Sequence, residues 1–569
     1  MKKNLMLVLV FCLLAPCLMA QGTPKWVSKK KAAVFSIITY DKNEKMLNSG
    51  NGFFVSEDGV ALSDYSLFKG ASKAVIINDR GEKMPVEKIL GADDLYDVVK
   101  FQVGITTKHV PALTLATTPA TVGSTVLILP YSTQKSIACA MGKVKSETKI
   151  DGKYSYFTLD MGLKDKMVSC PLMNIDGEVL GLVQKSAGVD SATICYAVDV
   201  NFAMSKKITA LSFNDAVLKG IGIKKELPDT EEQALVYLFM ASSQVSVVDY
   251  NNLLNDFIQE YPKSSEGYIR RAGYYIAQSK GDESILGKAD NDLKTALNVA
   301  QNKDDAEYNV AKLIYQYQLG TPQKTYKDWT LDNALEHARK AYEINPVPAY
   351  EQLEGDISFA QKKYMEAYTF YDKVNHSNLA SSATFFSAAK TKQMLKADNK
   401  EVIALMDSCI AYCKQPITSV SAPYLLERAL VYMQADSARA AMLDYDAYYK
   451  AVNGDVNDLF YYYREQSDNK CHQYQRALDD IAKAVELNPK SVIYRAEQAV
   501  VNLHVGRYEN AIRILNDAIV IDPTYSEAYR LRGICQLQLK NKTDACESFH
   551  KAKELGDTNV DSLIEKYCK

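Results

Sequence analysis

Ser66, Ser169 and Cys170 are the candidate nucleophiles in the N-terminal part of this sequence. A serine hydroxyl is a weak nucleophile unless a neighbouring base takes its proton. His109 is the only histidine of this N-terminal part, and it stands in a predicted loop away from all three. Asp97 could orient a histidine in a catalytic triad but does not replace one. These residues therefore allow serine hydrolysis only through an unusual geometry based on Ser66 or Ser169.

The spacing of cysteine and histidine predicts no metal site. The sequence has 11 cysteines and 6 histidines, with no CxxC pair and no Cys/His cluster at metal-ligand spacing. Cys12 and Cys17 lie in a predicted leader, and the nine others are an odd, scattered set that does not resemble a disulfide framework. Cys409 and Cys413 share one helix face, where core packing explains them. We therefore predict no metal and no cofactor.

The segment 1–20 has the layout of a secretory signal peptide. Two lysines precede an uncharged apolar run over 5–14, and Ala20 offers a cleavage site. The run is shorter than the ~20 residues of a spanning helix, and no later stretch is long enough either. We expect the mature chain to start at Gln21, to be periplasmic or secreted, and to have no membrane span.

Short strands are predicted between about residues 32 and 200. Apolar residues there alternate or form short runs, separated by glycine-containing turns. This pattern is typical of an all-β barrel or sandwich, here closed by a helix near 201–211. The predicted strands are 33–39, 52–55, 73–77, 97–103, 125–129, 156–159, 179–183 and 193–198.

A helical repeat begins near residue 230. Pro489 and Pro523 each end a helical segment, and their separation, 523 − 489, is 34. Small residues recur at the positions where two paired helices would cross closely. The pattern resembles the tetratricopeptide family, in which 34-residue helix pairs stack into a solenoid. The small residues are Ala477, Ala484, Ala499, Ala511, Ala518, Gly533, Ala545 and Ala552.

Weaker copies of this repeat extend upstream. Ala334 and Ala341 keep the spacing of one pair, and Gly355 with Ala367 fits the next. Helical stretches near 380–413 and 421–452 lack clear markers. We expect roughly nine helix pairs; the alternative is two helical subdomains with an irregular joint between them.

Four segments of the N-terminal half occur in the order typical of one protease family. Residues 52–63 read GFFVSEDGVALS, residues 97–101 read DVVKF, residues 171–181 read PLMNIDGEVLG, and a closing strand and helix follow. These segments resemble HtrA-type trypsin-like serine proteases around the catalytic histidine, the catalytic aspartate and the chain after the nucleophile. The resemblance covers about residues 32–212 and implies a trypsin-like double β-barrel.

The resemblance assigns the catalytic histidine to Ser66, the aspartate to Asp97 and the nucleophile to Val168. Residues 166–171 read KMVSCP where the family has GNSGGP, so the glycines of the oxyanion-hole turn are also absent. We therefore predict a pseudoprotease without catalytic residues. The alternative is an atypical trypsin-like serine endopeptidase that recruits substrates or partners through its repeats.

The predicted fold is an all-β trypsin-like double barrel followed by an all-α tetratricopeptide solenoid. On this fold Cys170 and Cys195 could form a disulfide. The predicted layout is a signal peptide over 1–20, an N-terminal tail over 21–31, the barrel domain over 32–212, a linker over 213–229, helical repeats over 230–556 (clearest over 458–556) and a capping helix over 557–569.

The first helices of stacked pairs line the concave face of a solenoid, which binds extended peptides or partner helices. A net charge of −2 gives no general attraction for nucleic acid. We predict an exported, non-catalytic scaffold whose repeats bind a protein or peptide and whose barrel is a second docking module; a purely architectural component is a further alternative. The predicted peptide-binding residues are Tyr462, Gln466, Asn469, His504, Arg530 and Gln538.

Overall fold

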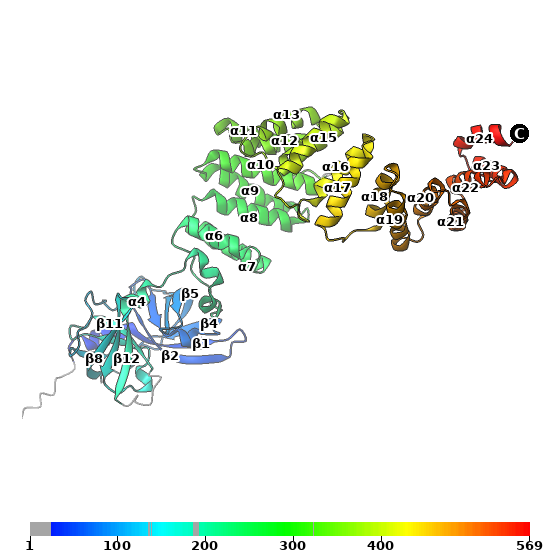
Figure 1. The fold of residues 1–569 in the computed structure, drawn as a ribbon. Helices are drawn as coiled ribbons and strands as arrows, with labels where there is room; N and C mark the ends of the chain where they lie inside the picture. The colour runs from blue at the N-terminus through cyan, green and yellow to red at the C-terminus, as the bar shows by residue number, and fades with distance from the viewer. Residues whose placement is uncertain (1–23, 135–136, 138, 186–192, 322–323, 569) are drawn as a thin grey trace, which may run out of the picture. The chain divides into compact units, whose positions relative to one another are not determined.

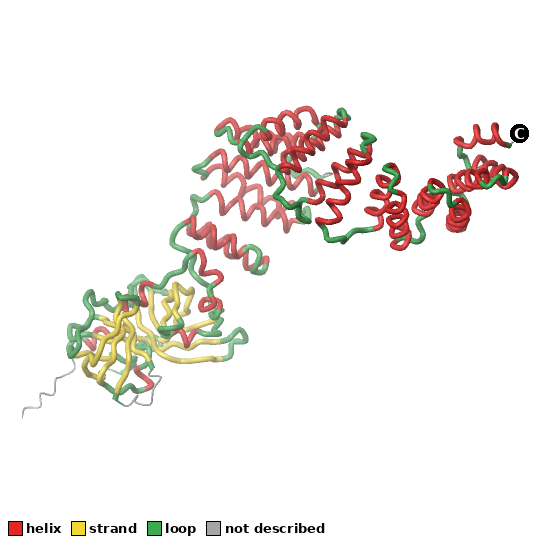
Figure 2. The backbone as a smooth tube through the Cα atoms, in the orientation of Figure 1, coloured by secondary structure: helices red, strands yellow, loops and turns green. Residues whose placement is uncertain are grey.

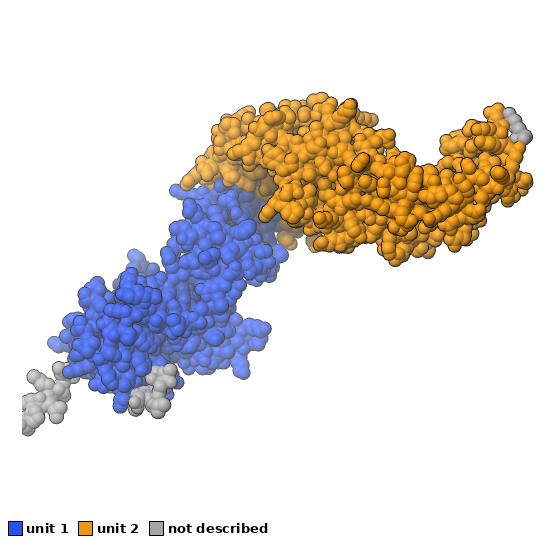
Figure 3. Space-filling model, in the orientation of Figure 1, with its two compact units in different colours: residues 1–274 blue, residues 275–569 orange. Residues whose placement is uncertain are grey.

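The computed structural model of the chain describes residues 24–134, 137, 139–185, 193–321 and 324–568. The chain forms two compact units, residues 1–274 and 275–569 (Figure 3). All twelve strands of the described residues belong to the first unit, whereas the second is helical (Figures 1 and 2). The predicted signal peptide lies outside the described residues. Among the helices that are described, none is both long and apolar enough to cross a membrane.

The first unit contains two closed antiparallel barrels of six strands each. The strand order is β1-β2-β3-β6-β5-β4 in the first barrel, and the second repeats this topology with β7 to β12. The predicted trypsin-like double barrel is therefore confirmed. The strands are β1 Val34–Tyr40, β2 Met46–Phe54, β3 Val60–Ser63, β4 Lys73–Ile77, β5 Lys83–Asp93, β6 Val98–Val103, β7 Thr125–Ile128, β8 Ala140–Ile150, β9 Tyr154–Asp160, β10 Pro171–Met173, β11 Val179–Gln184 and β12 Ile194–Asp199.

Four of these strands, β3, β5, β8 and β10, are not predicted by the sequence pattern. β8 is the clearest case: it reads AMGKVKSETKI, and only Val144 and Ile150 of its residues are buried. Such a strand lacks the apolar alternation by which strands are recognised. It is held by backbone pairing to β7 and β9 on its two sides. The short helices of the unit are α2 Val27–Lys30, η2 Lys31–Ala33, α3 Tyr65–Phe68, η3 Asp165–Met167, α4 Val200–Ser205, η4 Ala210–Asn214 and α5 Ala216–Lys219.

The segment 213–229, predicted to be a linker, packs against the first barrel. Ile221 and Leu227 are buried in the core of that barrel. The amide of Ile89 in β5 donates to the carbonyl of Lys224 at 2.7 Å. Two further helices extend the same core, so the first compact unit reaches residue 274. These helices are α6 Glu231–Ala241 and α7 Val247–Glu260.

The remaining helices form a continuous series. From α10 to α23 each helix contacts the next one along the chain, as Figure 1 shows for the second unit. The described residues contain eighteen helices from α6 to α23, which matches the roughly nine predicted pairs. They are α8 Ser265–Ser279, α9 Glu283–Val299, α10 Lys303–Gly320, α11 Leu331–Ile344, α12 Pro348–Ala360, α13 Tyr364–Asn375, α14 Ser382–Met394, α15 Asn399–Ala411, α16 Ala422–Gln434, α17 Ala438–Ala451, α18 Asp458–Lys470, α19 Tyr474–Leu487, α20 Val492–His504, α21 Tyr508–Ile521, α22 Ser526–Gln538 and α23 Lys542–Glu554, followed by η5 Thr558–Val560 and α24 Asp561–Tyr567.

The predicted repeat register is visible in the packing of the helix pairs. The alanines at the predicted crossing positions of the last three pairs are buried. A methyl group on Gly533 would lie 2.5 Å from the ring of Phe549, and one on Gly355 would lie 2.7 Å from the ring of Tyr371. Close helix crossing therefore requires a small residue here, in the last pair and in the upstream copy alike.

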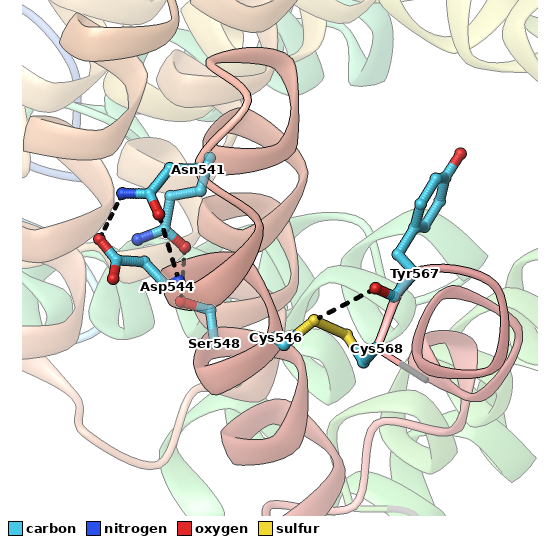
Figure 4. The surroundings of a disulfide bond; sticks show 7 residues. Asn541, Asp544, Cys546, Ser548, Tyr567 and Cys568 are labelled. Carbon is cyan, nitrogen blue, oxygen red and sulfur yellow. Dashed lines mark hydrogen bonds between the residues drawn. A yellow bond between two sulfur atoms is a disulfide. The ribbon is translucent and has the colours of Figure 1, made fainter.

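A disulfide that the sequence analysis misses closes the C-terminal end. Cys546 of α23 bonds Cys568, which follows α24, and their Cα atoms are 5.5 Å apart (Figure 4). The scattered cysteines do not reveal this pair, because the two thiols meet only after α24 has folded back onto α23. Cys170 and Cys195, which could have paired, are both free and buried.

Candidate functional site

The protease-type catalytic positions lie where the two barrels share a core. Ser66 is in α3, directly after β3, whereas Asp97 precedes β6 and Val168 precedes β10. Apolar residues from both barrels pack into one cluster beneath them. Asn51 of β2 links the barrels, since its Nδ2 donates to the carbonyl oxygen of Val168 at 2.9 Å. Asn51 therefore connects the segment of Val168 to the first barrel.

Ser66 and Asp97 are direct neighbours. The Ser66 amide donates to Asp97 Oδ1 at 2.6 Å, and the Ser66 hydroxyl donates to Asp97 Oδ2 at 3.0 Å. Asp97 adopts a left-handed backbone with φ of 47°, which turns its carboxylate toward α3. The aspartate therefore orients a serine here, in the place where the protease pattern has a histidine.

Ser169 is buried beside a second carboxyl group, which the sequence analysis does not anticipate. Only 1% of Ser169 is exposed, and its Oγ donates to Asp64 Oδ2 at 2.7 Å. Burial, and then the nearby Asp97 carboxylate, raise the pKa of Asp64 well above its usual range. Asp64 and Ser169 are 105 positions apart in the sequence, and their pairing is apparent only in the structure.

Two backbone amides at the nucleophile position, those of Val168 and Ser169, already donate to protein carbonyl groups. The amide of Val168 donates to the carbonyl of Asp165 at 3.4 Å, and the amide of Ser169 donates to the carbonyl of Val183 at 2.9 Å. An oxyanion hole needs amides that are free to meet a developing negative charge. Here these donors already bond to carbonyl groups of the protein.

His109 does not complete the site. Its Nδ1 lies 3.5 Å from Glu57 Oε2, in the loop after β6. Among the described residues, neither Ser66 nor Ser169 has a histidine as hydrogen-bond partner. Cys170 is buried, and its burial raises the pKa of the thiol to about 12, so it is a weak nucleophile.

The predicted peptide-binding residues lie on three successive first helices, α18, α20 and α22. Tyr462 is half-buried and its ring lies 5.2 Å from that of Tyr494 in the next pair. Asn469 on α18 and His504 on α20 are in contact between neighbouring helix pairs, with Asn469 Oδ1 2.8 Å from His504 Nδ1. Gln466 is half-buried on the same helix as Tyr462. The structure therefore brings some of these residues together in neighbouring pairs but does not gather all six in one cleft.

Arg530 and Gln538 have different surroundings on α22. Arg530 Nε donates to Asp557 Oδ2 at 2.8 Å, and the guanidinium also bonds Glu527. Asp557 is buried, so Arg530 ties the capping segment to the last helix pair instead of standing free. Gln538 is exposed and borders a pocket of about 450 Å³ beside α24.

Helix α18 also buries carboxyl groups that the sequence analysis does not single out. Glu465 lies two repeat periods before Gly533, since 533 − 465 is 68, and so takes the small-residue position of its pair. It is 0% exposed, and neither carboxyl oxygen has a hydrogen bond of standard geometry. Burial raises the pKa of Glu465 to about 9 and that of Asp468 to about 7.

A pocket of about 470 Å³ lies between α16, α17 and α18, and we call it the α16–α18 pocket. Tyr445 belongs to its wall, is 1% exposed, and has a hydroxyl without a hydrogen-bond partner among the described residues. The sequence analysis misses this pocket because 421–452 lacks clear repeat markers. Other wall residues are Leu426, Leu430, Tyr448, Leu459, Phe460 and Tyr463.

Comparison with known proteins agrees with this architecture. Residues 50–182 match the family of trypsin-like peptidase domains. The chain is 25% identical over 166 residues to a probable periplasmic serine endoprotease DegP-like from Halomonas elongata, which covers 28% of this chain and 34% of that protein. The N-terminal unit therefore contains a trypsin-like peptidase domain.

Other relatives match through shorter stretches. A DnaJ homolog subfamily C member 7 homolog from Dictyostelium discoideum is 34% identical over 91 residues, 15% of this chain and 17% of that protein. A small glutamine-rich tetratricopeptide repeat-containing protein 2 from Mycosarcoma maydis is 30% identical over 86 residues, 15% of this chain and 24% of that protein. The chain thus spans only about a sixth to a third of these relatives, and the match supports the predicted tetratricopeptide repeats.

Proposed function

We propose that this protein is an exported, non-catalytic scaffold that binds a protein or peptide through its helical repeats, with the double barrel as a second docking module. The observation that carries the proposal is the closed state of the protease-type site. Ser66 and Val168 stand at the histidine and nucleophile positions, and Ser169 is buried against Asp64.

The chemistry of the site supports a non-catalytic role. Acyl transfer needs a nucleophile that a substrate carbonyl can approach and a base that takes its proton. The Ser169 hydroxyl is buried, and the raised pKa of Asp64 favours the protonated acid, which does not accept that proton. Exposed Ser66 has only the carboxylate of Asp97 beside it. The Ser169–Asp64 bond joins the two barrels, and the Ser66–Asp97 bond joins two segments of the first barrel, instead of forming a reactive pair.

The alternative, an atypical serine endopeptidase, draws on one contact and on the family match. Ser169 Oγ and Asp64 Oδ2 are 2.7 Å apart, and a rearrangement that exposed this pair would present a hydroxyl next to a carboxyl group. A fluorophosphonate probe applied to the full chain, with trypsin as positive control, separates the two functions. We expect no covalent labelling and no cleavage of casein. Labelling that disappears in Ser169→Ala would establish the endopeptidase.

Export is supported by two independent features. The segment 1–20 has the layout of a signal peptide. The disulfide between Cys546 and Cys568 is typical of proteins that fold in an oxidising compartment. N-terminal sequencing of the protein from its native host should find Gln21 as the first residue; a chain that retains Met1 in the cytoplasm would contradict export.

The binding role predicts that a partner contacts the first helices of the last pairs. Affinity capture with the tagged mature protein should recover a partner that Tyr462→Ala and Gln538→Ala lose. Val520→Ala is the matched control, because Val520 is 81% exposed on the second helix α21. Equal recovery by all variants would show that the predicted groove is not the binding surface.

A further inference from the structure

The α16–α18 pocket is the strongest unassigned feature of the described residues. Its wall is formed mainly by leucine and aromatic side chains from three helices, and Leu459 at its edge is 44% exposed. The volume of about 470 Å³ falls within the range of protein pockets that enclose a ligand, about 300–1,000 Å³. An apolar group that entered it would be removed from water on several sides.

A second observation points to a ligand. Tyr445 is buried in the wall, yet its hydroxyl bonds to no described residue. A buried tyrosine hydroxyl usually has a hydrogen-bond partner. Tyr371 shows the contrast, because it occupies the same repeat position in an earlier pair and its hydroxyl donates to Asp356 Oδ1 at 2.8 Å. The Tyr445 hydroxyl oxygen is itself buried. A main-chain carbonyl that displaced the side chains covering it would accept its hydrogen bond in the same way.

The charges at the pocket restrict the kind of partner. Asp455 is the only charged side chain in the wall, and it is exposed. Nε and Nη2 of Arg428 donate to the two carboxylate oxygens of Asp444 at 2.8 and 2.7 Å, and the same atoms of Arg464 donate to Asp480 at 2.7 and 2.8 Å. Both arginines therefore already form ion pairs within the protein. A carboxylate on the partner would face Asp455 without a compensating cation, whereas a lysine or arginine would find an opposite charge.

We propose that the α16–α18 pocket binds an extended segment of a protein partner in which a large apolar side chain is followed by a lysine or arginine. The apolar side chain fills the pocket, a main-chain carbonyl accepts the Tyr445 hydroxyl, and the basic side chain pairs with Asp455. This inference rests on the proposed protein-binding function and specifies the chemistry of the segment that is bound.

The direct test uses the full chain and an array of ten-residue peptides. Each peptide carries Leu, Phe, Met or Trp followed by Lys, Arg, Ser or Glu in an otherwise Gly/Ser background. We expect basic peptides to bind at least about tenfold more tightly than their glutamate counterparts. Leu459→Trp, which fills the pocket edge, should abolish binding, and Asp455→Lys should reverse the preference. Equal affinity for basic and acidic peptides, no binding at all, or unchanged binding to Leu459→Trp would overturn the proposal.

A matched pair of variants tests the role of the hydroxyl. Tyr445→Phe removes a group with no partner, so the melting temperature should stay the same or rise while peptide affinity falls. Tyr371→Phe breaks the bond to Asp356, so the melting temperature should fall while peptide affinity is unchanged. A lower melting temperature for Tyr445→Phe would show that the hydroxyl is already paired and would contradict the proposal. If Tyr462→Ala blocks partner capture but no array peptide binds, the pocket proposal fails and the scaffold function stands.

Discussion

The barrel junction and the helices α16 to α19 differ in how their polar side chains are hydrogen-bonded. At the junction, Ser66 pairs with Asp97 and Ser169 pairs with Asp64. In the helices, Tyr445 and Glu465 are buried without hydrogen bonds of standard geometry. A buried polar group without a partner costs about 1–3 kcal/mol. Asp64 Oδ1 at the junction is also buried without a hydrogen-bond partner among the described residues. The two regions therefore differ in degree, because the second oxygen of Asp64 accepts from Ser169, whereas both carboxyl oxygens of Glu465 lack such a donor.

The largest expected effect tests the repeat register on which this comparison depends. Ala518 is buried at the helix crossing of α20 and α21. Ala518→Trp should cost about 1–3 kcal/mol or more through overpacking, and the neighbouring pairs should lose support as well. Thermal melts of the full chain measure this loss. Val520→Trp, on the exposed side of the same helix, should melt like the wild type; if it is the more damaging change, the register is wrong.

Loss of the C-terminal disulfide should have the next largest effect. Cys546 and Cys568 are 22 residues apart. A disulfide that closes a loop of this length restricts the unfolded chain and stabilises the folded state by about 3 kcal/mol. Cys546→Ser should therefore lower the unfolding free energy of the last helix pair, measured by hydrogen exchange over α22 to α24. Cys471→Ser is the control, because Cys471 is a half-buried free thiol. Equal losses in the two variants would argue against the disulfide.

A pair of serine substitutions separates the buried and exposed contacts at the barrel junction. Ser169→Ala leaves buried Asp64 without its hydrogen bond and should cost about 1–3 kcal/mol. Ser66→Ala removes an exposed hydroxyl and should change stability by about 0.5 kcal/mol or less. Urea unfolding of the full chain, followed by barrel tyrosine signals, measures both. If Ser66→Ala is as costly as Ser169→Ala, the site is not closed around Ser169.

A further prediction is that the folded chain loses stability as pH rises, because of Glu465. The pKa of Glu465 is about 9 in the folded chain because of burial and the nearby carboxyl groups of Glu497, Asp468 and Asp480, against about 4.3 when unfolded. Between these values the unfolded chain binds fewer protons, so stability falls as pH rises. Asp468 adds to the decline up to about pH 7.

Glu465→Gln imitates the protonated acid and should flatten this decline. Its melting temperature should exceed that of the wild type at pH 8 but equal it near pH 4. Glu486→Gln is the control, since Glu486 is exposed and pairs only with Lys483 at 2.7 Å. A parallel pH profile in Glu465→Gln and wild type would contradict a buried, protonated Glu465.

Much of the architecture follows from the sequence alone. The regular spacing of Pro489 and Pro523 and the small residues between them determine the helix pairs, because only a small side chain fits a close crossing. The ordered motifs around Gly52 and Pro171 determine the double barrel. Counting along these motifs assigns Ser66, Asp97 and Val168 to the triad positions, which stays a prediction. In the structure the Ser66 hydroxyl donates to Asp97.

Other features depend on contacts between residues that are distant in the sequence. The segment 213–229 looks like a linker by composition, but Ile221 and Leu227 reach an apolar core that only the folded barrel provides. Asp64 is 105 residues from Ser169, and no local pattern connects them. The Cys546–Cys568 bond and the α16–α18 pocket likewise require that helices first stack. Local periodicity determines which elements form, whereas burial and pairing of particular polar groups are decided only when the elements meet.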